Sequence, residues 1–308
     1  MESMPLVSVP VITYNSSKYV LETLESIKAQ TYQNIELVVS DDCSTDNTVE
    51  ICRRWIEKNK ERFVRVEMLE SPVNTGVSAN GNRAEAACHG EWIKVIAGDD
   101  MLISDCIETF VTYALSHPSS IYIFGRIQPF GVNEKRCQEV NSWFDYSFFS
   151  MPIEDQIHRL TFIGNCIPAS TAFYNRNAVT ELGVVNDERI SLLEDWPKWI
   201  NLLRKGVRFH FIDQELVKYR IGGISNSAQS ISYFTSKRQV FFYYQYPELL
   251  KENAEFAVNK AIEMERVLFV ENMDLRNQLT RIRKSLIYQI YSKTIYPIKS
   301  LIYKRTRR

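Results

Sequence analysis

Residues 91–102 read EWIKVIAGDDML, an apolar run that ends in a glycine and two adjacent carboxylates. Three earlier runs have the same form: VPVITYN at 9–15, ELVVSDDCSTDNT at 36–48 and VRVEMLESPVNTG at 64–76. Such runs, rich in β-branched residues, predict buried strands. If the four strands are parallel, the polar residues that follow them meet at one edge of a sheet, where open α/β folds bind ligands. The clusters at that edge are Thr13-Tyr14-Asn15, Asp41-Asp42, Asn74-Thr75-Gly76 and Asp99-Asp100.

The segments between these runs carry helical patterns, and this alternation sets the fold class. Alternating strands and helices imply right-handed crossovers and a mostly parallel α/β sheet flanked by helices. We expect the α/β region to end near residue 228 and a helical region to occupy 229–308. The pattern predicts strands at 7–13, 35–40, 64–69, 92–97, 121–130, 209–212 and 216–220, with helices that include 77–88, 104–116 and 192–204.

The composition is ordinary for a soluble globular protein. Hydrophobic residues make up 45% of the 308 residues and charged residues 24%, and no run approaches the roughly 18 apolar residues of a membrane span. The six cysteines have no metal-type spacing and no export signal precedes them, so we expect reduced thiols. The first strand is not followed by G-x-G-x-x-G, and G-x-x-x-x-G-K is missing. These absences argue against a dinucleotide dehydrogenase and a P-loop kinase.

The segment 281–308 differs in charge from the rest of the chain. It holds nine Lys or Arg and no Asp or Glu, whereas the first 280 residues hold 28 basic and 37 acidic side chains. Its Ile, Leu and Tyr residues between the cations are typical of an amphipathic segment at an anionic membrane surface. The alternative is a helix packed on the body with a solvated basic face. A nucleic-acid partner is disfavoured because the acidic body would repel phosphate.

The paired carboxylates point to the kind of ligand. A turn requires one Asp at most, so Asp99-Asp100 is poorly explained as a turn alone. Mg²⁺ and Mn²⁺ bind carboxylate oxygens together with phosphate oxygens, and the pair therefore favours a nucleotide ligand. Asp41-Asp42 has two open interpretations: it accepts hydrogens from a base or a ribose, or it interacts with the N-terminal dipole of the next helix.

A third acidic pair, Glu194-Asp195, precedes Trp196 in the helix expected at 192–204. One interpretation is a general base that faces the nucleotide site. The other is a solvated acidic helix start, which is common. Spacing alone does not choose between them.

Taken together, these blocks resemble the inverting family 2 glycosyltransferases with the GT-A fold. The resemblance covers about residues 5–225, because NTGVSANGN at 74–82, LEDWPKW at 193–199 and VKYRI at 217–221 continue the match. Two positions depart from the family pattern. Ala97 stands where many members have the first acid of D-x-D-D, and Gly222-Gly223 follow Ile221 where many carry a metal-reaching His.

The resemblance implies roles for individual residues. Asp99 and Asp100 would hold Mn²⁺ or Mg²⁺ on the donor diphosphate, Asp195 would be the catalytic base with Glu194 beside it, and Trp196 would contact the acceptor. The implied nucleotide-sugar site consists of Thr13, Tyr14, Asn15, Asp41, Asp42, Asn74, Gly76, Asn82, Arg83, Asp99, Tyr219 and Arg220.

The reaction expected from the resemblance is transfer of a hexose, glucose or galactose favoured, from a UDP-sugar with inversion to a β-glycoside. The acceptor expected is a saccharide on a lipid diphosphate, as in bacterial O-antigen, capsule or lipooligosaccharide synthesis. We expect a nucleotide-binding half at 1–103 and an acceptor-binding half at 104–228. The expected location is the inner face of the cytoplasmic membrane, held there by 281–308. The alternatives are an inert sugar-nucleotide- or glycan-binding protein on the same fold and, less favoured, a nucleotidyltransferase.

Overall fold

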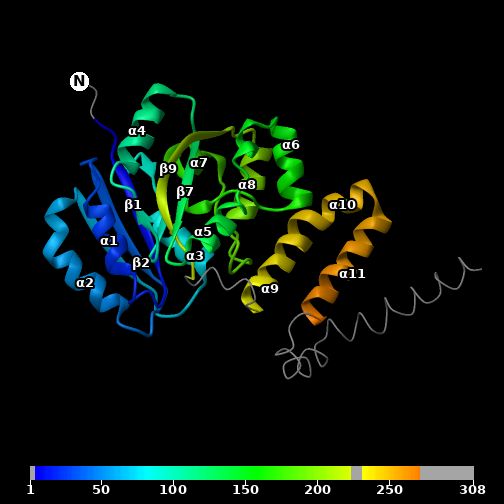
Figure 1. Cartoon of the computed structure of the whole chain (residues 1–308), viewed down its shortest axis with the longest axis horizontal. Coiled ribbons are helices and arrows are strands. Elements are labelled where there is room, and N and C mark those ends of the chain that lie inside the picture. The colour runs from blue at the N-terminus through cyan, green and yellow to red at the C-terminus, as the bar shows by residue number, and fades with distance from the viewer. Residues whose placement is uncertain (1–3, 223–230, 271–308) are drawn as a thin grey trace, which may run out of the picture. The chain divides into compact units, whose positions relative to one another are not determined.

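The computed structural model describes residues 4–222 and 231–270 (Figure 1). The chain divides into two compact units, Met1–Gln245 and Tyr246–Arg308. The predicted boundary at residue 228 and the basic segment 281–308 lie outside the described residues. In the described part, no helix is long and apolar enough to cross a lipid bilayer. All six cysteines are free thiols.

A nine-stranded sheet forms the centre of the first unit within the described residues. The strand order is β3-β2-β1-β4-β8-β7-β9-β6, and β5 also pairs with β1. Parallel pairing joins β1 to β2, β4 and β5, β2 to β3, and β7 to β9, whereas β8 and β6 run antiparallel to their neighbours. The strands are β1 Val7–Thr13, β2 Ile35–Asp41, β3 Arg65–Glu70, β4 Trp92–Ile93, β5 Ile96–Ala97, β6 Met101–Leu102, β7 Tyr122–Phe130, β8 Phe173–Asn175 and β9 Phe209–Arg220.

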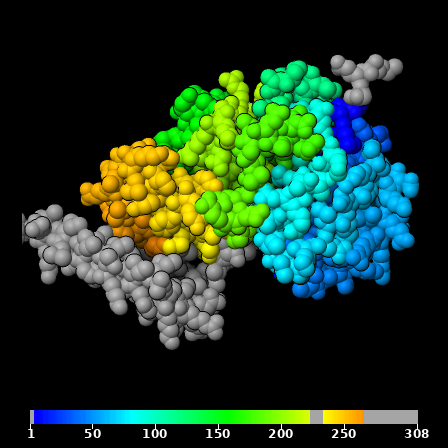
Figure 2. Space-filling view, turned by 180° about the vertical axis from the view of Figure 1, so that it is seen from behind, coloured from blue at the N-terminus to red at the C-terminus, as the bar shows by residue number. Residues whose placement is uncertain are grey.

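Helices cover both faces of this sheet, and the first hundred residues, blue to cyan in Figure 2, form one continuous part of the unit. The α-helices of the first unit are α1 Val20–Lys28, α2 Thr48–Asn59, α3 Val77–Ala86, α4 Cys106–Ser116, α5 Glu134–Asn141, α6 Ile153–His158, α7 Arg176–Leu182, α8 Asp195–Arg204 and α9 Ile231–Val240, and a π-helical turn η6 follows at Phe241–Gln245. The second unit contains α10 Tyr246–Glu252 and α11 Ala254–Val270. The predicted α/β fold with a mostly parallel sheet and a helical C-terminal extension is confirmed.

Two hydrophobic cores lie on opposite faces of the sheet because successive strand residues point to opposite sides. On β7, Ile123 belongs to the first core, whereas Tyr122 and Phe124 belong to the second. The first core includes residues of α1, α2 and α4, and the second includes residues of α7 and α8. Both cores are built mainly from buried aliphatic and aromatic side chains.

The strand predicted at 92–97 is divided into β4 and β5, and Pro10 explains the gap. On β1 the carbonyls of Ser8 and Ile12 accept hydrogen bonds from the N–H groups of Lys94 and Gly98. Pro10 lies between them on the same side of β1 and has no N–H to donate, so the ladder is interrupted there. The two strands predicted at 209–212 and 216–220 form the single strand β9, whose polar middle is exposed where β9 bulges away from β7 between Phe211 and Val217.

Candidate active site

The carboxyl ends of β1, β2 and β5 meet at one edge of the sheet, as predicted. Thr13 and Asp41 are register partners at the ends of β1 and β2, and Ala97 at the end of β5 pairs with Ile12. The Thr13 hydroxyl donates to Asp41 Oδ2 at 2.9 Å. The turn Gly98–Asp100 therefore leaves the sheet beside the acidic residues that follow β2.

A close approach at Gly98 holds this turn against β1. A Cβ at Gly98 would lie 2.8 Å from Thr13 Cγ2 and 3.3 Å from the carbonyl oxygen of Ile12. Side chains larger than hydrogen do not fit at that separation. Glycine thus lets the chain pass directly over Thr13 and present Asp99 and Asp100 at the edge.

Asp42 is saturated by protein donors. Its Oδ2 accepts the N–H groups of Thr75 and Gly76 at 2.9 and 2.7 Å, and its Oδ1 accepts the Thr75 hydroxyl at 2.6 Å and Arg83 Nη2 at 3.1 Å. An ionised carboxylate offers about four acceptor positions, and all are filled here. Asp42 therefore fixes the loop that leads into α3, whereas the dipole interpretation concerned the next helix, α2.

Asp41 accepts fewer hydrogen bonds from the protein than Asp42 does. Its Oδ1 accepts the N–H of Ser44 at 2.8 Å, and its Oδ2 accepts the hydroxyls of Ser44 and Thr13. Among the residues that the structure describes, one acceptor position of Oδ1 has no donor, so Asp41 is the better candidate of the pair for a ligand hydrogen. Its side chain is almost fully buried, with 1% exposure.

Asp100 is tied to the end of β9. Its Oδ1 accepts the backbone N–H of Arg220 at 2.8 Å, and the Arg220 Nε donates to the carbonyl oxygen of Asp99 at 2.8 Å. The Arg220 guanidinium lies over the rings of Tyr19 and Phe130, at 4.2 and 4.3 Å from their centroids. This sandwich holds the Tyr219-Arg220 pair beside the acidic turn, so the structure brings these sequence-predicted residues together.

A buried lysine that the sequence analysis did not single out lies near this turn. Lys94 is fully buried, and its Nζ donates to the carbonyl oxygens of Val95 and Ser170. Burial lowers the pKa of Lys94 to about 8. Burial raises the pKa of Asp100 well above its usual range, and the charge of Asp99 is the second cause. A charged residue inside an apolar strand, as in WIKVIA, is the signal that could have identified Lys94.

The turn that carries Asp99 and Asp100 suits a cation that binds these carboxylates and also binds oxygens of a bound ligand. Among the residues the structure describes, no three His, Cys, Asp or Glu side chains gather into a protein-only metal site. Asp99 is partly exposed, and one oxygen of Asp100 bonds to Arg220. One or two carboxylates are the usual protein share of a Mg²⁺ site that is completed by water and phosphate oxygens.

The third acidic pair lies at the N-terminus of α8. Asp195 is the first residue of α8, and Asn165 Nδ2 donates to its Oδ2 at 2.7 Å. Burial raises the pKa of Asp195. Burial, together with the charge of Asp195, raises the pKa of Glu194 to about 7. Both side chains are half-buried, so the pair is less exposed than a fully solvated helix start would be.

Contacts around α3 place the segment that leads to Asp195 near the Asp41-Asp42 turn at the edge of the sheet. A Cβ at Gly76 would lie 3.7 Å from Ser191, and Gly76 donates its N–H to Asp42 on the other side. The hydroxyl of Ser78 also donates to the carbonyl oxygen of Ile190. The start of α3 thus lies between the Asp41-Asp42 turn and the residues that precede Glu194-Asp195.

Backbone strain is confined to the loops of this site. The non-glycine residues with positive φ in the described chain are Asn15, Cys43 and Leu193, at 49°, 66° and 64°. Each lies in a loop next to a sequence-predicted site residue. Left-handed conformations of Cys and Leu are unfavourable and are found mainly at functional sites.

The other residues predicted for the nucleotide-sugar and acceptor sites lie in different surroundings. Tyr14 is half-buried at the end of β1, the Asn15 side chain caps the loop at Thr45, and exposed Asn74 accepts the Gly76 N–H at 3.2 Å. Trp196 is only 7% exposed, and its indole N–H donates to the carbonyl oxygen of Leu160 at 2.7 Å. In this structure the Trp196 ring is therefore part of the second core.

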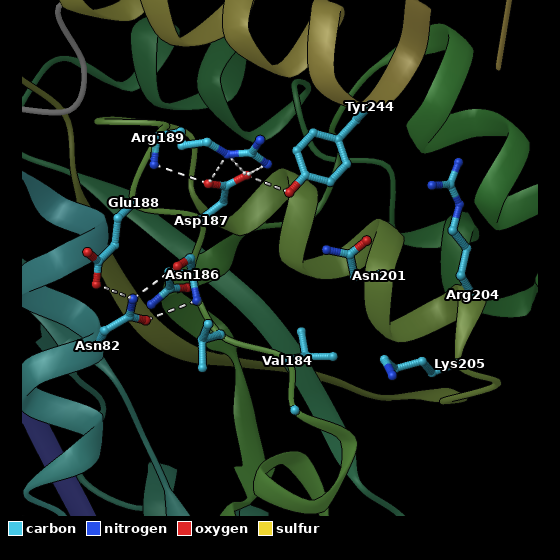
Figure 3. A pocket seen from close by; sticks show the side chains of 12 residues that line it. Asn82, Val184, Asn186, Asp187, Glu188, Arg189, Asn201, Arg204, Lys205 and Tyr244 are labelled. Atoms are coloured by element: carbon cyan, nitrogen blue, oxygen red, sulfur yellow. Dashed lines mark hydrogen bonds and ion pairs between the residues drawn. The ribbon is translucent and has the colours of Figure 1, made fainter. Parts of the chain in front are cut away.

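Asn82 points away from the other nucleotide-site residues. Its amide bonds to the backbone of Asn186 and to Glu188, and it lines a separate hollow of about 550 Å³ (Figure 3). Asp187, Arg189 and Tyr244 also line this hollow. The structure thus separates Asn82 from Arg83, which faces Asp42.

Known proteins with similar sequences are glycosyltransferases. The chain is 27% identical to an uncharacterized glycosyltransferase of Haemophilus influenzae over 98% of this chain and 91% of the relative. It is 26% identical to the Escherichia coli UDP-Glc:alpha-D-GlcNAc-diphosphoundecaprenol beta-1,3-glucosyltransferase WfaP over 73% of this chain and 81% of that protein.

Solved structures show the same fold. S. aureus TarS 1-349 in complex with UDP-GlcNAc has a TM-score of 0.60 at 17% identity, covering 92% of this chain and 77% of that one. The mannosyltransferase PcManGT from Pyrobaculum calidifontis, in complex with GDP-Man and Mn²⁺, has a TM-score of 0.56 at 18% identity, covering 94% and 84%. The chain spans 46% of a longer TarS chain. The predicted GT-A architecture is confirmed by these likenesses.

The family assignment comes from the sequence profile described as "Glycosyl transferase family 2", which matches residues 8–183. The matched range contains β1 to β8 and with them the acidic residues that follow β2 and β5. It covers more than half of the chain, and the chain therefore belongs to glycosyl transferase family 2.

Proposed function

We propose that this protein is an inverting glycosyltransferase that moves a hexose from a UDP-sugar to a hydroxyl of a lipid-diphosphate-linked saccharide. One observation carries the proposal. The start of α3 lies between the acidic edge of the sheet and the segment that ends in Asp195, through the Asp42–Gly76 bond and the Gly76–Ser191 contact. A donor held at the edge would then have a proton acceptor beside it.

The donor would bind along the carboxyl ends of β1, β2 and β5. Asp41, with an acceptor position to spare, would take a hydrogen of the uridine, and Asp99 would contact the ribose. Arg220, fixed against Asp99 and Asp100, would lie against the diphosphate, where its charge favours the departing anion. The other residues proposed to line the donor site are Thr13, Tyr14, Asn15, Asp42, Asn74, Gly76, Arg83 and Tyr219. Asn82 was also predicted for this site, but its amide bonds to Asn186 and Glu188 in the separate hollow.

Asp99 and Asp100 would hold Mn²⁺ or Mg²⁺ together with the donor diphosphate. Such an ion, when bound, acts as a Lewis acid that offsets the negative charge on the leaving diphosphate. The pair of carboxylates after β5 supports this assignment, and so does the Mn²⁺ in the PcManGT complex. Ala97 contributes no carboxylate, so the protein share of the site rests on these two residues.

Asp195 would accept the proton of the acceptor hydroxyl as that oxygen attacks the anomeric carbon. The attack on the face opposite the diphosphate inverts an α-linked donor to a β-glycoside in a single displacement. Asn165, bonded to Asp195 Oδ2, would fix the orientation of the carboxylate so that its other oxygen faces the acceptor. Glu194 would tune the basicity of Asp195 through its charge.

The acceptor and the location are inferred from the relatives and from the charge of the C-terminal segment. WfaP, by its name, transfers glucose from UDP-Glc to a sugar on diphosphoundecaprenol, which supports a UDP-hexose donor and a lipid-linked acceptor. A role in bacterial surface polysaccharide synthesis follows. The basic segment 281–308 would hold the enzyme at the anionic inner face of the cytoplasmic membrane. Trp196 is proposed for the acceptor side, where it would border the sugar only if the core around it opened.

The proposed domain boundaries follow from these roles in donor, acceptor and membrane binding. Residues 1–228 would form the catalytic domain, with the nucleotide half at 1–103 and the acceptor half at 104–228. Residues 229–308 would form a helical C-terminal region that ends in the basic, membrane-associating segment 281–308. Its first part, α9 and η6, belongs to the compact unit Met1–Gln245.

A screen of sugar nucleotides for UDP release tests the proposal. The protein is incubated with UDP-glucose, UDP-galactose or UDP-N-acetylglucosamine and Mn²⁺, with and without a GlcNAc-diphospholipid acceptor. We expect acceptor-dependent release of UDP that is fastest with a UDP-hexose. Failure of every donor and acceptor pair to release UDP would refute the proposal.

A further inference from the structure

Helix α9 presents one face to the segment that leads to Asp195. Tyr233, Ser236 and Val240 are spaced three and four residues apart, so they share one side of the helix. Ser236 and Val240 are fully buried, and Val240 belongs to the second core. The polar member of this buried stripe, Ser236, therefore needs partners within the protein.

Those partners are the two residues before Leu193. The Ser236 hydroxyl oxygen accepts the backbone N–H of Leu192 at 2.9 Å and lies 3.2 Å from Ser191 Oγ. Leu193 follows with a φ of 64°, a conformation that is unfavourable for a branched side chain. The Ser236 hydrogen bond thus fixes the backbone at Leu192, immediately before the strained residue Leu193. The acidic pair Glu194-Asp195 follows directly.

A second anchor lies one helical turn beyond α9. The Tyr244 hydroxyl, in η6, donates to Asp187 Oδ2 at 2.7 Å, and Arg189 also binds Asp187 (Figure 3). The Arg189 guanidinium lies 4.4 Å from the ring centroid of Tyr243. The donors from Arg189 and Tyr244 lower the pKa of Asp187 to about 2, so this anchor stays ionised at neutral pH.

The opposite side of the same segment is fixed by α3, where Ser78 binds the carbonyl oxygen of Ile190. Residues 187–192 are thus held from two directions, by α3 on the donor side and by α9 with η6 on the other. Burial and the charge of Asp195 raise the pKa of Tyr233, which agrees with a Tyr233 side chain close to that carboxylate.

We propose that α9 and η6 form a clamp on residues 187–192 that positions the carboxylate of Asp195, with Ser236 as the main positioning residue. The proposal rests on the proposed function, because it assumes that Asp195 is the base. Ser236 does not touch the reactants. Its hydroxyl acts through the backbone of Leu192 and the turn at Leu193.

The test compares Ser236→Ala with Thr235→Ala, an exposed neighbour on the same helix. We expect Ser236→Ala to lower kcat about tenfold, because small displacements of a catalytic group are costly. The KM for the UDP-sugar and the Kd for UDP should stay within about twofold of wild type, since α3 and the donor edge are untouched. Amide hydrogen exchange in 187–193 should become faster only in Ser236→Ala.

Two further variants test other contacts of the clamp. They also keep the test possible if Ser236→Ala does not fold. Ser191→Ala keeps the Leu192 bond, so its kcat should fall less than that of Ser236→Ala. Tyr244→Phe removes the hydroxyl that binds Asp187 and should speed exchange at 187–190 with a several-fold loss of kcat. Equal kcat for Ser236→Ala and Thr235→Ala would overturn the clamp. Unchanged exchange at 187–193, or an equal loss of UDP affinity, would also overturn it.

These outcomes separate the clamp from the proposed function. Wild-type protein that releases no UDP from any donor would refute the proposed function. Exchange at 187–193 would still report on the clamp in that case, because it requires no turnover.

Discussion

The carboxylate of Asp100 accepts a 2.8 Å hydrogen bond from the backbone N–H of Arg220, 120 residues further along the chain. This bond joins the turn that follows β5 to the end of β9. It also places a cationic side chain against the acidic turn, because Arg220 Nε bonds to the carbonyl of Asp99. Charge of both signs therefore meets where a diphosphate would lie.

Asp100→Asn should abolish the dependence of UDP binding on Mn²⁺. The amide keeps an oxygen for the Arg220 N–H but lacks the negative charge that a cation requires. We expect UDP affinity in Mn²⁺ to fall by about 10–100-fold, the loss typical even of changes next to metal ligands. Titration calorimetry with UDP, with Mn²⁺ or with EDTA, measures this. An affinity equal to wild type in both buffers would contradict the metal role.

Gly98→Ala should destabilise the fold and block the site. The added Cβ would meet Thr13 Cγ2 at 2.8 Å and the Ile12 carbonyl at 3.3 Å. Overpacking of this kind costs about 1–3 kcal/mol of the free energy of unfolding. Urea unfolding of Gly98→Ala and of the control Ala97→Ser, at an exposed neighbouring position, measures the difference. Equal unfolding midpoints would show that the turn does not lie against β1.

Glu194→Gln should change both stability and activity with pH. Burial and the charge of Asp195 raise the pKa of Glu194 to about 7, so the folded state binds the proton more tightly than the unfolded state. Stability from this group is complete below the unfolded pKa of about 4.3 and is lost as pH rises through 7. The glutamine variant should therefore gain stability over wild type at pH 8 and lose that advantage near pH 4.

The same variant should change the kcat profile only above about pH 7. Below that pH Glu194 is mostly protonated, so glutamine has the same charge and Asp195 ionises as in wild type. Above it, the wild-type Glu194 charge makes Asp195 a stronger base, and glutamine removes that effect. Thermal melts and initial rates between pH 5 and 9 measure the changes in stability and in kcat. Identical kcat profiles of wild type and Glu194→Gln above pH 7 would show that the Glu194 charge does not act on Asp195.

Deletion of residues 281–308 should weaken binding to anionic lipid. The nine cations in this segment attract an acidic membrane by about 1 kcal/mol each when they lie at its surface. Sedimentation with vesicles of phosphatidylglycerol, compared with neutral phosphatidylcholine, measures the loss. Identical partitioning of the full chain and the shortened chain would exclude the segment as the membrane contact.

Much of the sheet could be predicted because burial on both faces makes each parallel strand a continuous apolar run. The clusters after β1, β2 and β5 meet as expected, since parallel strands end at the same edge. The division of the strand predicted at 92–97 was missed, although Pro10 signals it because proline cannot donate to a ladder. Lys94 was missed although a cation inside an apolar run is an unusual pattern.

Other features depend on contacts between distant segments that no local pattern encodes. Asp42 is saturated by Thr75, Gly76 and Arg83, which lie 33 to 41 residues away. Asn165 reaches Asp195 from a loop 30 residues earlier. Trp196 carries an aromatic ring suited to sugars, yet its helix turns that ring into the core. Local sequence therefore gives the residue types of the site but not their partners.

The stereochemistry of the product tests the central claim most directly. UDP-α-glucose is incubated with a GlcNAc-diphospholipid acceptor and Mn²⁺, and the anomeric proton coupling of the new linkage is measured by NMR for wild type and Asp195→Asn. We expect a β-linkage from wild type and about 10²–10⁴-fold slower transfer from Asp195→Asn, because a general base contributes a factor of that size. UDP binding of the variant should be unchanged. An α-linked product, or full activity in Asp195→Asn, would contradict the account.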